Sequence, residues 1–353
     1  MNKNLFPALF ILIFMGISVV MAFLYMPTAI SKTENPTLKS IMVGTWAPTF
    51  EKSLNESFPI FNSIRNFWGR LEYDVFNEGR KGVLIGKNGW LFTDEEFECI
   101  RHGDQNMMTN LDFIKATAEE LQNKNVKLVV ALIPSKARLY KDYLGDYKVP
   151  VCRTDLYAKT ISYLQDNSIT GISLLDVFSE TPEKDTLFLK TDTHWTPEGA
   201  NLAATTIAKN INSAEFTSKE FQSNTEKAKP HEGDLLRYLP GVKNDVIKED
   251  TMNVFVTQES SSGNSVDTAL DLFGDTVVPI TLVGTSYSAN PSWNFYGFLK
   301  DALDVDILDM SDEGQGPFAV MKAYIESETW RNTPPSLVIW EIPERYMTMV
   351  PPS

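Results

Sequence analysis

Two short segments of the chain hold the residue types of an acyl-transfer or hydrolytic site. Asp192-Thr193-His194-Trp195 supplies a carboxylate and an imidazole, and Gly284-Thr285-Ser286-Tyr287-Ser288 supplies a hydroxyl. In a Ser-His-Asp triad the imidazole removes the serine proton, while the carboxylate orients the imidazole and stabilises its charged form. The residue types therefore predict a catalytic site of Asp192, His194 and Ser286. Their order along the chain is no obstacle, because triads are defined by geometry.

Each segment also has a plainer structural interpretation. The run from Gly284 to Ser288 follows an apolar stretch and could be an ordinary polar turn between a strand and a helix. Asp192 and His194 could cap a helix that begins at Thr196-Pro197, a good N-cap and first helical position. The segment at 231–237 (HEGDLLR) could border the pocket, but we favour a solvated loop for His231. A metal site is not expected, because no third ligand lies at a suitable spacing from Asp192 and His194.

Other polar residues fall where predicted strands end, at the edge of the sheet where α/β proteins bind ligands. Lys136 follows the apolar run at 127–133, and Glu341 and Arg345 lie at the end of the run at 336–342. We favour a structural ion pair between Glu341 and Arg345 over a catalytic role. The residues expected to contact a substrate are Lys136, Tyr287, Arg345 and Tyr346.

The positions of these residues depend on short apolar runs separated by segments of helical length. Continuous apolar runs of four to eight residues are typical of buried parallel strands. Their alternation with helices predicts a three-layer α/β fold with a central, mostly parallel sheet. We expect this domain at 76–353, with an insertion rich in loops at 214–274. Asn88-Gly89 predicts a hairpin at 82–92. The predicted strands lie at 127–133, 172–177, 277–283, 305–308 and 336–342.

The N-terminus predicts a membrane anchor. Leu5 to Tyr25 carries no charge, and a helix of that length rises roughly 31 Å, about the thickness of a bilayer core. A cleaved signal peptide is the alternative, but the run is long and lacks a small-residue cleavage site. We therefore expect a signal anchor at 1–26, with Lys3 on the cytoplasmic side and the body exported. Residues 27–75 are expected to form a tether followed by amphipathic helices.

Composition excludes some classes of function. The net charge is −14 and the pI is about 4.8, whereas a nucleic-acid-binding protein needs a basic surface. A hydrophobic content of 43% suffices for a sizeable core. Cys99 and Cys152 are the only cysteines. In an exported body they could form a disulfide, although free thiols stay open from the sequence.

Five motifs taken together resemble the alginate O-acetyltransferase family of AlgJ and AlgX proteins. The similarity covers roughly Phe76 to Tyr346, and this chain is most like the membrane-anchored, AlgJ-type members. The resemblance implies an SGNH-hydrolase-like fold, with Ser286 as nucleophile, His194 as base and Asp192 as its partner. The motifs occur in the same order as in the family: 86–92 (GKNGWLF), 134–136 (PSK), 192–195 (DTHW), 284–288 (GTSYS) and 340–346 (WEIPERY).

The resemblance also implies a place and a reaction. A periplasmic domain, held at the inner membrane by Leu5–Tyr25, would transfer acetyl groups to an exopolysaccharide through an acetyl-serine. No cofactor is implied. A polytopic membrane-bound O-acyltransferase would relay the acetyl group, alongside other acetylation or export proteins. The alternatives are a carbohydrate acetylesterase with the same triad and a non-catalytic component of a polysaccharide export complex.

Overall fold

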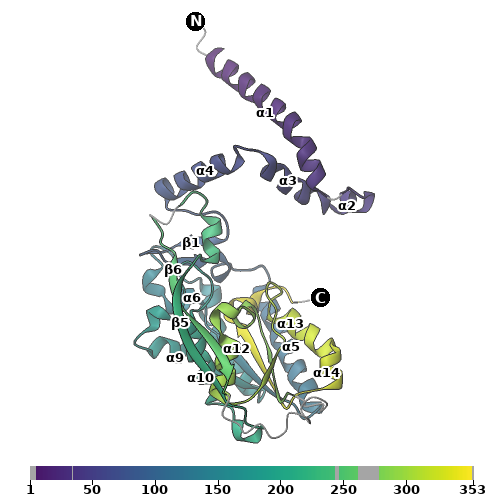
Figure 1. Cartoon of the computed structure of the whole chain (residues 1–353), viewed down its shortest axis with the longest axis vertical. Coiled ribbons are helices and arrows are strands. Elements are labelled where there is room, and N and C mark those ends of the chain that lie inside the picture. Colours follow the sequence, from purple (N-terminus) through teal and green to yellow (C-terminus); the bar gives the residue numbers. More distant parts are fainter. Residues whose placement is uncertain (1–4, 34, 243–245, 261–277, 352–353) are drawn as a thin grey trace. The chain divides into compact units, whose positions relative to one another are not determined.

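The structure is a computed structural model that describes residues 5–33, 35–242, 246–260 and 278–351 (Figure 1). It divides into two compact units. One comprises Met1–Asn77 with Leu239–Lys243, and the other comprises Glu78–Tyr238 with Asn244–Ser353. The predicted boundary between residues 75 and 76 lies close to this division.

A five-stranded parallel sheet forms the centre of the larger unit, as the sequence predicts. The strand order is β4-β3-β9-β7-β8, and each neighbouring pair is parallel. The strands read as continuous apolar runs because helices cover both faces of such a sheet. Their bounds are β3 (Lys127–Ile133), β4 (Thr170–Ser173), β7 (Ile280–Val283), β8 (Ile307–Asp309) and β9 (Leu337–Pro343).

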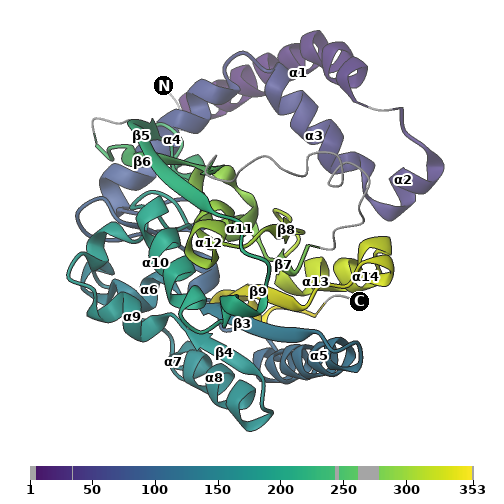
Figure 2. The ribbon, with the colours of Figure 1, turned by 60° about the horizontal axis from the view of Figure 1, so that its bottom comes forward.

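Helices pack on both faces of the sheet and complete three layers (Figure 2). Val129 and Ala131 of β3 join the core cluster on one face, whereas Val130 and Leu132 join the cluster on the other. The first face carries α9 (Leu175–Glu180), α10 (Pro197–Ala208) and α12 (Phe295–Leu303). The second carries α5 (Gly103–Asn123), α8 (Leu156–Asp166), α13 (Pro317–Glu326) and α14 (Glu328–Asn332).

Two local predictions have different outcomes. The hairpin is confirmed: β1 (Val83–Ile85) pairs antiparallel with β2 (Leu91–Thr93), and Asn88 and Gly89 both have positive φ, as a type I′ turn requires. The strand expected at 172–177 is wrong in its second half, because β4 ends at Ser173 and helix α9 begins at Leu175. A short apolar run fits either element, and periodicity alone does not separate them.

The region at 214–274 was expected to be rich in loops, but its described part contains a long antiparallel ribbon. Strand β5 (Phe221–His231) pairs with β6 (Asp250–Glu259), and the register shifts between Glu226 and Lys229. Most side chains of β5 are exposed, which explains why its sequence lacks the apolar signal of a strand. Residues 243–245 and 261–274 lie outside the described residues.

The smaller unit is helical. Helix α1 spans Leu5–Lys32, and its part at Ile11–Lys32 is long and apolar enough to cross a membrane. The segment expected to be a tether is largely helical, because α1 continues to Lys32 and α2 (Leu38–Val43) follows with a Thr37 capping box. Helices α3 (Trp46–Ser57) and α4 (Phe61–Phe76) confirm the predicted amphipathic helices.

Three further short helices and a disulfide complete the larger unit. The helices are α6 (Lys136–Leu139), α7 (Val151–Thr154) and α11 (Ser286–Ala289). Cys99 and Cys152 form a disulfide. It ties the segment before α5 to α7, so the pairing that the sequence left open is present in the structure.

Candidate active site

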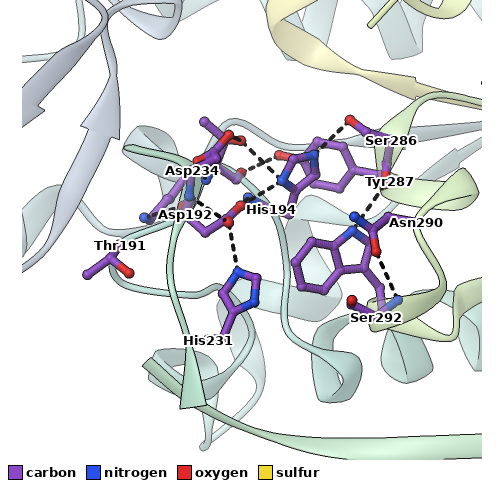
Figure 3. Close-up of polar contacts among 12 residues, drawn as sticks. Thr191, Asp192, His194, His231, Asp234, Ser286, Tyr287, Asn290 and Ser292 are labelled. Atoms are coloured by element: carbon purple, nitrogen blue, oxygen red, sulfur yellow. Dashed lines mark hydrogen bonds and ion pairs between the residues drawn. The ribbon is translucent and has the colours of Figure 1, made fainter. Parts of the chain in front are cut away.

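The structure brings the three predicted triad residues together at the carboxyl edge of the sheet (Figure 3). His194 Nε2 lies 2.7 Å from Ser286 Oγ, and His194 Nδ1 lies 2.6 Å from Asp192 Oδ1. The carboxylate accepts from Nδ1–H, which leaves Nε2 of a neutral imidazole free to accept the serine proton. A continuous path of hydrogen bonds thus runs from carboxylate to hydroxyl.

A tight loop holds the acid and the base. Phe188 and Trp195 form an antiparallel bridge, and the N–H of Leu189 donates to the carbonyl of His194 at 3.1 Å. Helix α10 begins directly afterwards, where the Thr196 hydroxyl accepts from the N–H of Gly199. The predicted helix start is therefore confirmed. Thr196 caps the helix, whereas the carboxylate of Asp192 accepts from both the backbone N–H and the ring of His194.

His231 is part of the site, and the prediction of a solvated loop is wrong. Its Nε2 lies 2.9 Å from Asp192 Oδ2, so Asp192 contacts a different imidazole with each oxygen (Figure 3). The N–H of Asp234 also donates to Oδ2 at 2.9 Å. Burial would raise the pKa of Asp192, but hydrogen bonds from His194 and His231 hold it well below its usual range. The carboxylate is therefore ionised at neutral pH.

Two carboxylates from the ends of the ribbon hold the same loop. Asp234, just after β5, accepts from the N–H and the hydroxyl of Thr193 at 2.9 and 2.7 Å. Asp250, the first residue of β6, accepts from the N–H of Lys190 and from the N–H and hydroxyl of Thr191. The ribbon thus positions the acid–base loop. The sequence predicted only an insertion rich in loops here and did not predict this role.

Lys136 supports the loop from within the protein and does not face a substrate. Its side chain is 1% exposed, and Nζ donates to the carbonyls of Leu91, Lys190 and Asp192 at 2.6, 3.0 and 2.8 Å. Burial lowers the pKa of Lys136 to about 8. The predicted substrate contact is corrected: a fully enclosed ammonium with three carbonyl acceptors has no surface left for a ligand.

The nucleophile turn is held by a buried carboxyl group. Glu341 on β9 is fully buried, and its Oε2 accepts from the N–H of Thr285 at 2.7 Å and from the hydroxyl of Ser288 at 3.0 Å. Gly284 leaves the space for this contact, because a Cβ there would lie 2.6 Å from Glu341 Oε2. Burial raises the pKa of Glu341 despite these hydrogen bonds. Ser286, between the two tethered residues, stays partly exposed.

The remaining predicted contact residues are mostly structural. The Tyr287 hydroxyl donates to the carbonyl of Thr193 at 2.6 Å and accepts from Arg345 Nη1 at 3.1 Å. Arg345 is buried and pairs with Glu95 at 3.1 Å, so the expected ion pair with Glu341 is wrong. Tyr287 is 1% exposed. Tyr346, by contrast, keeps part of its surface exposed.

The indole of Trp293 completes the wall beside the triad. Its ring stacks on His194 with centroids 5.2 Å apart, and its Nε1–H donates to the carbonyl of Ser286 at 3.1 Å. One residue therefore restrains both the base and the nucleophile. An aromatic wall also keeps water away from one face of the imidazole.

The side chains of Asp192, His194 and Asp234 could also be considered for a cation, because one atom of each lies within 4.8 Å of the others. The hydrogen bonds describe a different use of these atoms. Asp192 and His194 bind each other, and both oxygens of Asp234 accept from Thr193. The donor set thus fits proton transfer along the triad better than coordination of a metal.

Comparison with known proteins identifies the family of the chain. Residues 83–344 match the family model described as SGNH hydrolase-like domain, acetyltransferase AlgX. A probable alginate O-acetylase AlgJ of Pseudomonas syringae pv. tomato is 36% identical over 96% of this chain and 88% of its own length. That of Pseudomonas aeruginosa is 37% identical, covering 88% and 81%.

A solved structure gives the same result. The O-acetyltransferase domain of Pseudomonas putida AlgJ superposes with a TM-score of 0.70 at 33% identity, covering 77% of this chain and 94% of that one. The sheet, the triad geometry and these similarities agree on one assignment. The chain belongs to the AlgJ/AlgX family of SGNH hydrolase-like acetyltransferases and is an O-acetyltransferase.

Proposed function

We propose that this protein transfers acetyl groups to hydroxyl groups of alginate in the periplasm, through an acetyl ester on Ser286. The observation that carries the proposal is the path of hydrogen bonds from Asp192 through His194 to Ser286. The substrate is inferred from relatives that are named probable alginate O-acetylases. An ester intermediate divides one difficult transfer into two easier steps.

In the first step Ser286 Oγ attacks the carbonyl carbon of an acetyl donor. His194 Nε2 takes the hydroxyl proton and then gives it to the departing oxygen of the donor, so that the C–O bond to the donor breaks as the bond to Ser286 forms. The ionised Asp192 stabilises the imidazolium between these events. General acid–base catalysis of this kind contributes about 10²–10⁴-fold to a rate.

In the second step a sugar hydroxyl replaces the donor. His194 Nε2 removes its proton, the sugar oxygen attacks the acetyl carbon, and the proton returns to Ser286 Oγ as the ester bond breaks. The N–H of Tyr287 donates to the Thr285 hydroxyl at 3.3 Å, so this donor is already engaged in capping α11. An oxyanion donor from this turn would therefore be the N–H of Ser286 rather than that of Tyr287.

The N-terminal helix supports the proposed location. If Ile11–Lys32 is an uncleaved anchor in the inner membrane, the catalytic unit lies in the periplasm, where acetyl-CoA is absent. The acetyl group must then cross the membrane on another protein. A polytopic membrane-bound O-acyltransferase would supply it, and Ser286 would accept it without a resident cofactor.

Transfer and hydrolysis can be separated with the full chain in detergent. The protein is given a chromogenic acetyl ester, with or without mannuronate oligosaccharide, and acetylated sugar and free acetate are measured. We expect acetylated sugar with the wild type and none with Ser286→Ala. Ser292→Ala is the matched control, because its backbone N–H rather than its hydroxyl bonds Asn290.

Release of free acetate at a rate unaffected by sugar would contradict transfer and identify an esterase. Full acetylation by a folded Ser286→Ala variant would contradict the catalytic assignment and leave a non-catalytic component of the export machinery.

A further inference from the structure

Helix α4 carries an exposed aromatic face on the side away from its contact with Pro240. Ile64, Phe67, Trp68 and Val75 follow helical spacing and are 48%, 64%, 53% and 60% exposed. Gly69 lies on roughly the opposite side of the helix, at ~100° per residue. There its backbone meets Pro240 so closely that a Cβ would not fit.

The neighbouring helices have no protein core either. Among the described residues of α2, α3 and α4, Gly69 is the one buried residue. Helix α2 exposes Leu38 and Met42 by more than four-fifths of their surface. Isolated helices of six to sixteen residues are marginal in water, and most helical stability comes from burying an amphipathic face. Helix α3 packs against α1, whereas α2 and α4 bury almost no apolar side chain among the described residues, so their apolar faces favour a partner outside the chain.

The chemistry of the segment points to a bilayer surface as that partner. Helix α4 follows the candidate membrane span in the chain, so it is tethered close to the lipid. Aromatic side chains, tryptophan above all, favour the level of the lipid headgroups.

The segment at 37–76 is electrically neutral, with four basic residues (Lys39, Lys52, Arg65, Arg70) and four acidic ones (Glu51, Glu56, Glu72, Asp74). A neutral amphipathic helix binds through apolar burial and does not need anionic lipid.

We propose that α4 lies in the membrane interface, with Ile64, Phe67, Trp68 and Val75 in the headgroup and acyl boundary. The segment at 37–76 would then bind the membrane surface and hold the catalytic unit there, rather than act as a free tether. This inference rests on the proposed membrane anchor. It adds a second contact with the bilayer that the anchor alone does not require.

The disulfide makes a direct test possible. Both native cysteines are paired, so an engineered cysteine is the single free thiol for a nitroxide label. The full chain is reconstituted in vesicles of phosphatidylcholine, and collisions of the label with oxygen and with a water-soluble nickel chelate are measured. Phe67→Cys and Val75→Cys probe the proposed membrane face, and Asn62→Cys, on the polar side of α4, is the matched control. Ile17→Cys probes the anchor itself.

We expect the oxygen-to-nickel collision ratio at Phe67→Cys and Val75→Cys to exceed that at Asn62→Cys several-fold. The ratio should be unchanged when phosphatidylglycerol is added to the vesicles. A ratio equal to that at Asn62→Cys would show that the face lies in water and would overturn the proposal. Protection from both reagents would also overturn it, because the face would then be covered by protein, from the same chain or a second copy.

The labels distinguish an error in the proposed anchor from an error in the proposed interfacial helix. If Ile17→Cys reports water, the anchor is wrong, and the proposal for α4 fails with it. If Ile17→Cys reports the bilayer centre while Phe67→Cys reports water, the anchor stands and only the interfacial helix is refuted. Acetyl transfer in the detergent assay is measured separately and does not depend on either label.

Discussion

The acid–base loop and the nucleophile turn meet through the His194–Ser286 hydrogen bond and the bond from the Tyr287 hydroxyl to the Thr193 carbonyl, yet the protein holds the two segments by opposite means. The buried ammonium of Lys136 binds backbone carbonyls of the loop, including that of Asp192. The buried carboxyl group of Glu341 binds the backbone N–H of Thr285 and the Ser288 hydroxyl in the turn. The loop thus depends on a buried donor, and the turn depends on a buried acceptor.

This difference between a donor and an acceptor follows from the backbone groups that each segment leaves without a partner. The tight loop at 188–195 turns carbonyls inward, whereas the start of α11 leaves N–H groups without helical partners. Unpaired backbone groups are costly when buried, so each side chain satisfies the groups next to it. Charged residues that looked available for a ligand are used to position the site.

We expect the largest loss of stability and activity at Lys136, whose ammonium donates to three backbone carbonyls. Lys136→Met removes the Nζ donor from the buried carbonyls of Leu91 and Asp192, and each unsatisfied group costs ~1–3 kcal/mol. The Lys190 carbonyl keeps the N–H of Leu91 as a donor. Because removing the buried charge offsets part of that cost, we expect the free energy of unfolding to fall by about 3 kcal/mol and acetyl transfer to fall about 100-fold. Urea unfolding and the transfer assay measure the two effects.

Lys190→Met is the control: this lysine belongs to the same loop but is exposed, and the loss of its side chain should cost under about 0.5 kcal/mol. The pH dependence of stability gives a second test of the buried ammonium. The folded pKa of Lys136, about 8, lies below its ordinary value of 10.5, so the unfolded chain binds more protons between these values. Wild-type stability should therefore rise relative to Lys136→Met as pH increases through this window. A constant difference would contradict the buried ammonium.

For substitutions of Glu341, beside the nucleophile, we expect a smaller loss of stability and activity. Glu341→Ala removes the acceptor of the Thr285 N–H and the Ser288 hydroxyl and leaves a cavity, at a cost of about 2–3 kcal/mol. Glu341→Gln keeps an oxygen acceptor and should cost under about 1 kcal/mol. Activity should follow the same order when assayed with the acetyl ester. Equal losses with Ala and Gln would show that the carboxyl group, and not merely an acceptor, is needed.

The smallest effect is expected at His231, which supports Asp192 from its outer side. His231→Phe removes the hydrogen bond to Asp192 Oδ2, and we expect kcat to fall about tenfold with KM little changed. His231→Gln retains an N–H donor and should recover most of the rate. Asp234 still donates to Oδ2 in both variants, which is why the loss stays modest.

The pH dependence of stability tests the same contact. The hydrogen bond to Asp192 raises the pKa of His231 above its ordinary value of 6.5, although burial opposes the shift. The stabilisation is therefore fully present below pH 6.5 and is lost as pH rises through the higher folded value. Wild type should lose stability relative to His231→Gln over that interval. If the two proteins keep a constant difference, the contact is not charge-dependent.

The sequence predicts the parts of the molecule that depend on local pattern. Strand β3, the hairpin at Asn88-Gly89, the start of α10 and the triad segments all follow from neighbouring residues. Glu341 also carries a local signal, because a single carboxyl group within the apolar run SLVIWEI indicates a buried acceptor.

The remainder depends on contacts between distant segments. His231 reaches Asp192 across 39 residues, and Lys136 reaches Asp192 across 56. Neither pairing leaves a periodic pattern in one sequence, so His231 was predicted to be solvated and Lys136 to meet a ligand. The exposed ribbon was missed for a related reason, because few of its side chains enter the core.

Detection of the acetyl-enzyme is the most direct test of the central claim. The full chain is mixed with the acetyl ester without sugar, quenched in acid, digested and examined by mass spectrometry. We predict one acetyl group on the peptide that contains Ser286, absent from Ser286→Ala and discharged in the wild type when mannuronate oligosaccharide is added before the quench. Formation of acetylated sugar while the Ser286 peptide never carries an acetyl group would contradict the account.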